Sequence, residues 1–268
     1  MLKEKRTVIF IPSLTNRQHG YPPMQSRKIL NVTFVLFGFF TICSFLFASP
    51  DLSYSESNTP TISANKDNQL IGIDVSHYQG NVDWQQVKKD GVNFAYLKAT
   101  DGITFQDPRY THNKDTLIQL HLPHGSYHFF EANDDPILQA KNFLKTTGTK
   151  MILPPVLDIE ISKGQTAELI KSRVKIWLDY VEKQTACRPM IYSYGDFWET
   201  YMKDEFSAYK FWLADYAPRP NLPSGQDTWE FWQKSQTSQL NGIKGNVDLD
   251  IFNGDSTKLQ TLFCKQST

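Results

Sequence analysis

An apolar stretch at residues 153–160 (LPPVLDIE) ends in two acidic residues one position apart, Asp158 and Glu160. Side chains alternate between the two faces of a strand, so both carboxyls emerge on one face, with Cα atoms about 6.6 Å apart. Two neighbouring acids at the edge of a core resist ionising together, which moves their pKa values apart. This pattern predicts a pair for general acid–base chemistry.

Other predicted strands also carry acids at or near their ends, namely Asp74, Asp215, Asp248 and Asp250. Asp215 or Asp250 taken alone is better explained as a helix-capping or solvent-exposed acid. Acids at the ends of several strands are harder to explain as solvent-exposed residues without a function. The acids at the strand ends are therefore candidates for catalysis, and Glu160, Asp158, Asp74 and Asp248 are among them.

The elements that must position these acids alternate between short apolar runs and amphipathic segments. Eight strands are predicted, at residues 71–75, 92–99, 125–130, 153–160, 189–194, 210–216, 228–233 and 247–252. Helices are predicted at residues 81–90, 108–120, 135–147 and 166–185. Strands joined by helical crossovers predict an α/β fold, a parallel TIM-like (β/α) barrel. Few helical runs follow residue 201, so its second half is expected to be irregular and helix-poor. In such barrels the catalytic side chains lie at the carboxyl ends of the strands.

Aromatic residues accompany the acids along the same strands. Sugar rings present C–H faces that pack against aromatic rings, and tyrosine and tryptophan can also reach hydroxyl groups. Any one of these rings is more simply explained as core packing, whereas the group fits a carbohydrate-binding cleft. Besides Tyr194 and Tyr216, the group contains the five predicted substrate contacts, Tyr78, Tyr127, Tyr192, Trp212 and Trp232.

Residues 29–48 are overwhelmingly apolar, and as a helix they span about 30 Å, enough to cross a bilayer core. Basic residues before this segment predict a cytoplasmic amino terminus. We predict a basic cytoplasmic segment (1–28), a transmembrane signal anchor or signal peptide (29–48), a flexible spacer (49–69) and a barrel domain (70–268). A retained anchor is favoured over cleavage near Ala48. The barrel is then membrane-anchored outside the cytoplasm, in the periplasm or at the cell surface, or secreted if the helix is cleaved.

Charge and cysteine content argue against nucleic-acid binding and against a metal site built from cysteines. The net charge of zero divides into +5 for residues 1–28 and −5 for the remainder. An acidic body gives no support for nucleic-acid binding. The three cysteines form no CxxC pair, so no metal or cofactor is predicted. Cys187 and Cys264 either pair in an oxidising compartment or remain two unpaired core residues.

Eight short motifs occur in a fixed order across residues 71–254: GIDVSHYQGNVDW, KATDG, GSYHFF, LPPVLDIE, PMIYSY, WLADY, WQ and VDLDIFNG. Together they resemble glycoside hydrolase family 25, the lysozymes that cut the β-1,4 bond after N-acetylmuramic acid in peptidoglycan. The resemblance implies a modified α/β barrel that acts on the peptidoglycan glycan strand without a cofactor. We expect its body to be monomeric.

The resemblance also implies roles for single residues. It matches Glu160 with the general acid that protonates the glycosidic oxygen. It matches Asp158 with the neighbouring carboxylate, which steers the N-acetyl group or stabilises the cationic centre. Asp74 and Asp248 match acids on opposite walls of the site. Asp250 stands where an asparagine is common in the family, so no catalytic role is assigned to it.

Two other functions are considered. His124 and His128 have the HxxxH spacing of a metal site, as in polysaccharide deacetylases. The acidic pair of those enzymes is missing from an early strand, and structural histidines are the preferred explanation. A non-catalytic cell-wall-binding protein on the same fold is the other alternative. The intact acids argue against it, because a protein that only binds need not keep them.

Overall fold

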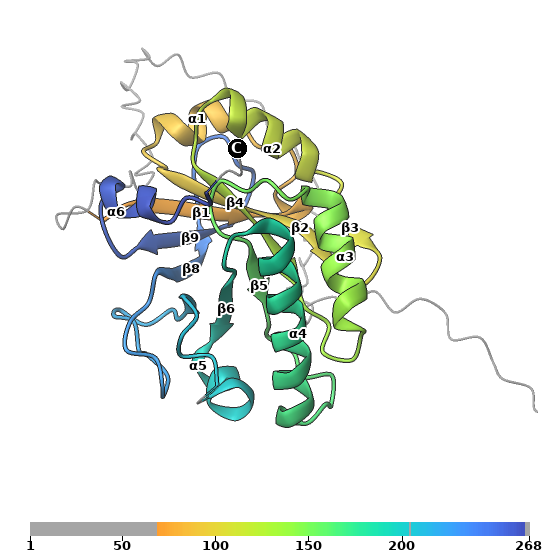
Figure 1. The fold of residues 1–268 in the computed structure, drawn as a ribbon. Helices are drawn as coiled ribbons and strands as arrows, with labels where there is room; N and C mark the ends of the chain where they lie inside the picture. The colour runs from red at the N-terminus through yellow and green to blue at the C-terminus, as the bar shows by residue number, and fades with distance from the viewer. Residues whose placement is uncertain (1–68, 204, 266–268) are drawn as a thin grey trace, which may run out of the picture. The chain divides into compact units, whose positions relative to one another are not determined.

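The computed structural model describes residues 69–203 and 205–265, and within them eight strands close into a barrel (Figure 1). The barrel closes because β1 pairs with β2 on one side and with β9 on the other. All eight predicted strands are confirmed: β1 (Ile71–Val75), β2 (Phe94–Asp101), β4 (His124–Phe129), β5 (Val156–Asp158), β6 (Met190–Tyr194), β7 (Phe211–Ala214), β8 (Phe231–Ser238) and β9 (Val247–Phe252).

The expectation of a fully parallel barrel is wrong at β9, which runs antiparallel to both β8 and β1. A parallel neighbour needs a crossover of a dozen or more residues, and the short 239–246 connection carries no helix. As a result, the amino end of β9 lies with the carboxyl ends of the other barrel strands. A short strand that was not predicted, β3 (Phe105–Gln106), pairs with the end of β2.

The four predicted helices are also confirmed: α1 (Trp84–Lys89), α2 (Tyr110–Gln119), α3 (Pro136–Thr147) and α4 (Ala167–Thr185). Asp135 caps α3 by accepting from the amides of Ile137 and Leu138, and proline follows it at the first helical position. Helices α3 and α4 pack side by side outside the sheet (Figure 1).

The second half is helix-poor, as predicted. After α4 it contains only α5 (Gly195–Phe197), the π-helical turn η2 (Trp198–Met202) and α6 (Ser256–Thr261) among the residues that the structure describes.

The barrel interior is filled by large side chains from every second strand position. Its buried cluster includes Phe94, Tyr96, Val156, Met190, Trp212, Phe231 and Phe252. Two strand glycines make room for these rings. A Cβ on Gly72 would lie 2.1 Å from the Phe94 ring, and a Cβ on Gly125 would lie 2.1 Å from the Tyr96 ring. A second core separates the sheet from the helices.

Of the two alternatives for Cys187 and Cys264, the structure contains the disulfide, which joins residues 77 positions apart. Among residues 69–203 and 205–265, no helix is both long and apolar enough to cross a membrane. The predicted segments 1–28 and 29–48, and the spacer 49–69 except its last residue, lie outside the described residues. Their roles stay predictions.

Candidate active site

The four predicted acids gather at one end of the barrel, which we call the mouth. Asp74 and Asp158 are buried near the carboxyl ends of β1 and β5, and Glu160 is half-buried just beyond β5. Asp248 lies directly opposite Asp74 in the β1–β9 register. It reaches the mouth from the amino end of its strand, because β9 is antiparallel.

Asp158 and Glu160 form a hydrogen-bonded carboxyl pair. Burial raises the pKa of both carboxyls, and the charge of Glu160 raises that of Asp158 further. The hydrogen bond itself raises the pKa of Asp158 and lowers that of Glu160. Both carboxyls of the pair therefore hold a proton to higher pH than free acids. The Oδ1 atom of Asp158 is buried without a hydrogen-bond partner among the described residues.

A second group of acids faces this pair and includes Asp250, to which the sequence assigned no role. Burial and then the charge of Asp248 raise the pKa of both Asp74 and Asp250. Burial and then the charge of Glu160 raise the pKa of Asp248 to about 6, against a lowering hydrogen bond with Asp74. Asp250 is fully buried and accepts a 3.0 Å hydrogen bond from Trp212 Nε1. The mouth therefore holds carboxyls that retain protons to higher pH than free acids.

Lys98 is a cation of this site that the sequence-based prediction missed. Its ammonium lies 3.0 Å from Asp101 Oδ2 and 4.8 Å from the centre of the Phe129 ring. Its positive charge lowers the pKa of both Asp158 and Glu160. A charged residue within the otherwise apolar run at 92–99 was the available signal, because a buried strand rarely carries lysine without a role.

Gln233, named only as part of a motif, connects several site residues. Its Nε2 donates to Asp74 Oδ2 at 2.9 Å. Its Oε1 accepts from the hydroxyls of Tyr192 at 3.0 Å and Tyr216 at 2.9 Å. The amide thus links an acid of β1 to Tyr192 within β6 and to Tyr216, which follows β7.

The five predicted aromatic contacts do not all reach the mouth in the same way. Tyr78 is exposed at the rim, and Tyr127 is half-buried among the acids, whose charges, after burial, raise its pKa. Tyr192 is buried and engaged with Gln233. Trp212 is 2% exposed and forms the floor of the site, below any position from which it could stack on a sugar.

Trp232 lies on the other face of β8. It packs with Ile71 and Ile251 and donates its indole N–H to the carbonyl of Asp215. Because it is adjacent to Gln233 in the strand, it cannot share the inward face. The structure therefore does not support its predicted contact with substrate, whereas the exposed Tyr194 and Tyr216 are better placed for that role.

The HxxxH histidines are satisfied within the fold. His128 is fully buried, with Nδ1 2.7 Å from Thr100 Oγ1 and Nε2 3.0 Å from Gln139 Oε1. Nδ1 of His124 lies 2.9 Å from the carbonyl of Leu122. Both ring nitrogens of His128 already have partners, so this pair does not form the metal site of a deacetylase. Residues 69–203 and 205–265 contain no cluster of histidine, cysteine and acidic side chains arranged to hold a metal ion.

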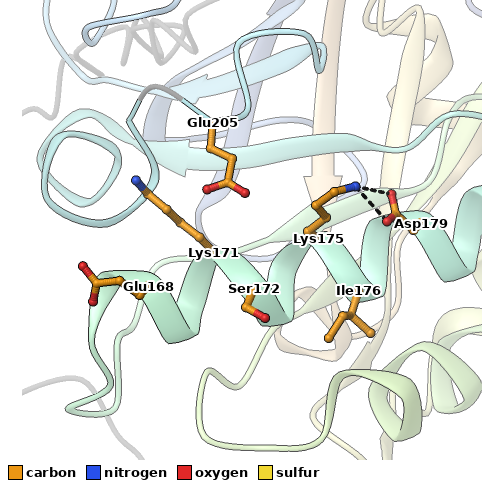
Figure 2. Close-up of a pocket in the computed structure, with 7 residues that line it drawn as sticks. All are labelled: Glu168, Lys171, Ser172, Lys175, Ile176, Asp179 and Glu205. Carbon is orange, nitrogen blue, oxygen red and sulfur yellow. Dashed lines mark hydrogen bonds and ion pairs between the residues drawn. The ribbon is translucent and has the colours of Figure 1, made fainter.

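A shallow pocket elsewhere on the molecule lies along α4 (Figure 2). It contains none of the predicted site residues. Its Lys175 and Asp179 pair with each other at 2.8 Å across one helical turn. Charged side chains that neutralise one another on a helix surface give this pocket no catalytic arrangement.

Comparison with known proteins places this chain in one family of glycosyl hydrolases. A family model described as glycosyl hydrolases family 25 matches residues 73–243. The uncharacterized protein YegX of Escherichia coli (strain K12) is 38% identical over 197 residues, which are 71% of this chain and 72% of that protein. Lysozyme M1 of Streptomyces globisporus is 34% identical over 206 residues, 71% of this chain and 70% of that protein.

Solved structures with the same fold include the bacterial lysozyme from Streptomyces coelicolor, at 32% identity and a TM-score of 0.69. That similarity covers 72% of this chain and 96% of the lysozyme. A family GH25 lysozyme from Aspergillus fumigatus has 28% identity and a TM-score of 0.66, covering 74% of this chain and all of that one. The family match includes Asp74, Asp158, Glu160 and Gln233, and it ends before β9.

Proposed function

We propose a lysozyme-type muramidase activity for this chain, which belongs to glycosyl hydrolases family 25 and is therefore a glycoside hydrolase. The family resemblance seen in the ordered motifs is confirmed. Lysozymes among its relatives support a peptidoglycan-cleaving hydrolase. The finer proposal is that the chain hydrolyses the β-1,4 bond between N-acetylmuramic acid and N-acetylglucosamine.

The observation that carries this proposal is the hydrogen-bonded pair of Asp158 and Glu160 at the mouth. Glycoside cleavage needs one protonated carboxyl at the leaving oxygen and negative charge near the developing oxocarbenium ion. Glu160 is the more exposed of the two and is the general acid. Asp158, held beside it, is the charged partner of the protonated Glu160.

Asp158 also has an oxygen that is free to act on the substrate. In the described part of the chain, its buried Oδ1 has no hydrogen-bond partner. A buried carboxylate oxygen without a partner is costly, and an acetamido N–H of the bound sugar would supply one. We infer that Asp158 orients the N-acetyl group, which can then act as an internal nucleophile, as in substrate-assisted glycosidases.

Asp74 and Asp248 form the opposite wall of the site. Their ionised forms place negative charge across the cleft from the general acid, where the oxocarbenium ion develops. Tyr78, Tyr127, Tyr194 and Tyr216 offer rings and hydroxyls at the rim for the glycan strand.

The proposal is tested with Glu160→Gln on purified peptidoglycan. The amide keeps the size of the side chain but cannot supply the proton, so clearing should fall by at least about 100-fold. Glu168→Gln changes an exposed glutamate at the start of α4 and serves as the matched control. Wild-type clearing by Glu160→Gln would refute the assignment of the general acid.

Mass analysis of the released muropeptides tests the bond. Products with reducing muramic acid ends support the muramidase proposal. Reducing glucosamine ends would show cleavage of the other glycosidic bond. Intact wall binding without any new reducing ends would instead favour the non-catalytic alternative.

We also propose that the barrel works outside the cytoplasm, anchored by residues 29–48 or secreted after their cleavage. The Cys187–Cys264 disulfide supports this, because disulfides persist mainly in oxidising compartments. Amino-terminal sequencing of the mature protein distinguishes the two forms. A start near Ser49 would exclude the retained anchor.

A further inference from the structure

His77 lies at the mouth, just beyond the carboxyl end of β1, and begins the short helical turn η1 (His77–Gln79). Its Nδ1 atom lies 2.8 Å from Oδ2 of Asp107, and its backbone N–H donates to the same oxygen at 2.9 Å. Oδ1 of Asp107 accepts from the backbone N–H of Arg109 at 2.8 Å. One buried acid therefore ties the segment after β1 to the segment before α2.

Asp107 also determines which ring nitrogen of His77 carries the proton. An ionised carboxylate can only accept hydrogen bonds, so Nδ1 must be the donor of this pair. In the neutral ring the proton is then on Nδ1, and Nε2 presents a lone pair. Nε2 has no hydrogen-bond partner among the described residues, and it is not one of the buried atoms that lack a partner. It is therefore an acceptor that is open to solvent.

Two aromatic side chains pack against the imidazole of His77. The centre of the Tyr78 ring lies 4.2 Å from it, and the centre of the Phe105 ring lies 5.5 Å from it. Tyr78 is 74% exposed and Phe105, in β3, is 38% exposed, so both also present ring surface to solvent. We call these three residues the β1–β3 cluster. It combines apolar ring faces with a fixed hydrogen-bond acceptor, which are the two kinds of contact that a sugar ring offers to match.

The β1–β3 cluster borders the acids of the site. The ammonium of Lys98, the cation of that site, lies 5.8 Å from the centre of the Phe105 ring. Burial, the acids of the mouth and then the charge of Asp107 raise the pKa of Tyr127, which lies among those acids. A glycan strand that extends beyond the acids on the side of β1 and β3 therefore meets the cluster.

We propose that the β1–β3 cluster is a sugar-binding subsite in which Nε2 of His77 accepts a hydrogen bond from a hydroxyl group of the glycan strand. The rings of Tyr78 and Phe105 pack against C–H faces of the strand. Because Asp107 and the two rings already hold the imidazole in the free protein, little side-chain entropy is lost when the hydroxyl binds. This inference rests on the proposed function, since it concerns how the same cleft holds its glycan.

The first test is His77→Asn, assayed on glycan strands freed of their peptides. The asparagine amide keeps an N–H near the position of Nδ1, so the bond to Asp107 is retained, whereas nothing replaces Nε2. Loss of one hydrogen bond to substrate should raise KM by about 3- to 10-fold and leave kcat and Tm unchanged. His112→Asn, at an exposed position of α2, is the matched control and should leave all three unchanged.

His77→Gln separates substrate binding from a purely structural role. The longer glutamine can place its Oε1 acceptor near the position of Nε2, but it has no donor at the position of Nδ1. Its KM should therefore lie closer to that of the wild type than the KM of His77→Asn does. If His77 only tied its loop to Asp107, the order of the two variants would be reversed. That reversed order would overturn the proposal, and so would a raised KM confined to substrates that carry peptides.

A binding measurement separates the subsite from the proposed function. The Nε2 signal of His77 in the ¹⁵N spectrum is identified by its absence in His77→Asn. In Glu160→Gln, which should not cleave the strand, this signal should shift when peptide-free glycan is added. The absence of a shift at saturating glycan would overturn the subsite. A shift combined with no cleavage by the wild type would refute only the proposed function.

Discussion

Replacing Asp248 by asparagine should stabilise the protein and weaken its catalysis. The pKa of Asp248 rises from 3.8 to about 6, through burial first and the charge of Glu160 second. A shift of this size corresponds to about 3 kcal/mol of unfavourable free energy when the carboxyl is ionised in the folded protein. Asparagine removes the charge and keeps a side-chain oxygen that can accept the hydrogen bond from Asp74.

The gain in stability should depend on pH in a defined direction. Below the unfolded pKa of 3.8, Asp248 is protonated in both the folded and unfolded states, so its titration costs no stability. As the pH rises toward 6, the unfolded chain releases the proton more easily than the folded one, and stability falls. Asp248→Asn should therefore gain up to about 3 kcal/mol at about pH 8 and little at about pH 3.5.

Urea denaturation of the wild type and Asp248→Asn at both pH values measures this difference. The exposed Asp227→Asn is the control, and its free energy of unfolding should change by less than about 0.5 kcal/mol. An equal effect of Asp248→Asn at both pH values, or a loss of stability at the higher one, would refute the reasoning. Peptidoglycan clearing by Asp248→Asn should fall, because an active site commonly sacrifices stability for function.

Three further outcomes are expected. Replacing Cys187 and Cys264 by alanine removes a disulfide that closes a loop with a sequence separation of 77. The free energy of unfolding, measured by urea denaturation, should fall by about 4 kcal/mol. An unchanged free energy would show that the disulfide does not stabilise the fold. Gly125→Ala places a Cβ 2.1 Å from the ring of Tyr96 and should lower the free energy of unfolding by about 1–3 kcal/mol in the same assay. Gly195→Ala is the control, because its new Cβ has no atom within 4 Å and should leave this free energy unchanged. EDTA should leave clearing activity unchanged, because both ring nitrogens of His128 are already engaged; loss of activity restored by zinc would contradict this.

The barrel strands and most of the acids at the mouth could be predicted because strands repeat with a period of two. Asp158 and Glu160 were expected on one face from their spacing alone, and the structure joins them by a hydrogen bond. The same rule would have excluded Trp232, since it is adjacent to Gln233 in a strand. That prediction was drawn from the type of side chain without regard to its face.

Other features depend on contacts that no local pattern contains. From the sequence, Asp250 could be a surface acid with no role in the site. Its place in the site follows from the hydrogen bond that it accepts from Trp212, 38 residues away. The raised pKa values of Asp158 and Glu160 depend first on their burial, which only the closed barrel defines. The predicted connection at 234–246 was long enough for a parallel crossover, whereas β8 extends to Ser238 and leaves a connection too short for one.

The pairing of β1 with β9 also affects how the enzyme is made. The first strand of the barrel cannot complete its hydrogen bonds until the last one has emerged from the ribosome. Asp248 arrives with that last strand, so a partly synthesised chain lacks one wall of the site. Such long-range closure is slow, and it delays the appearance of activity until synthesis of the barrel is complete.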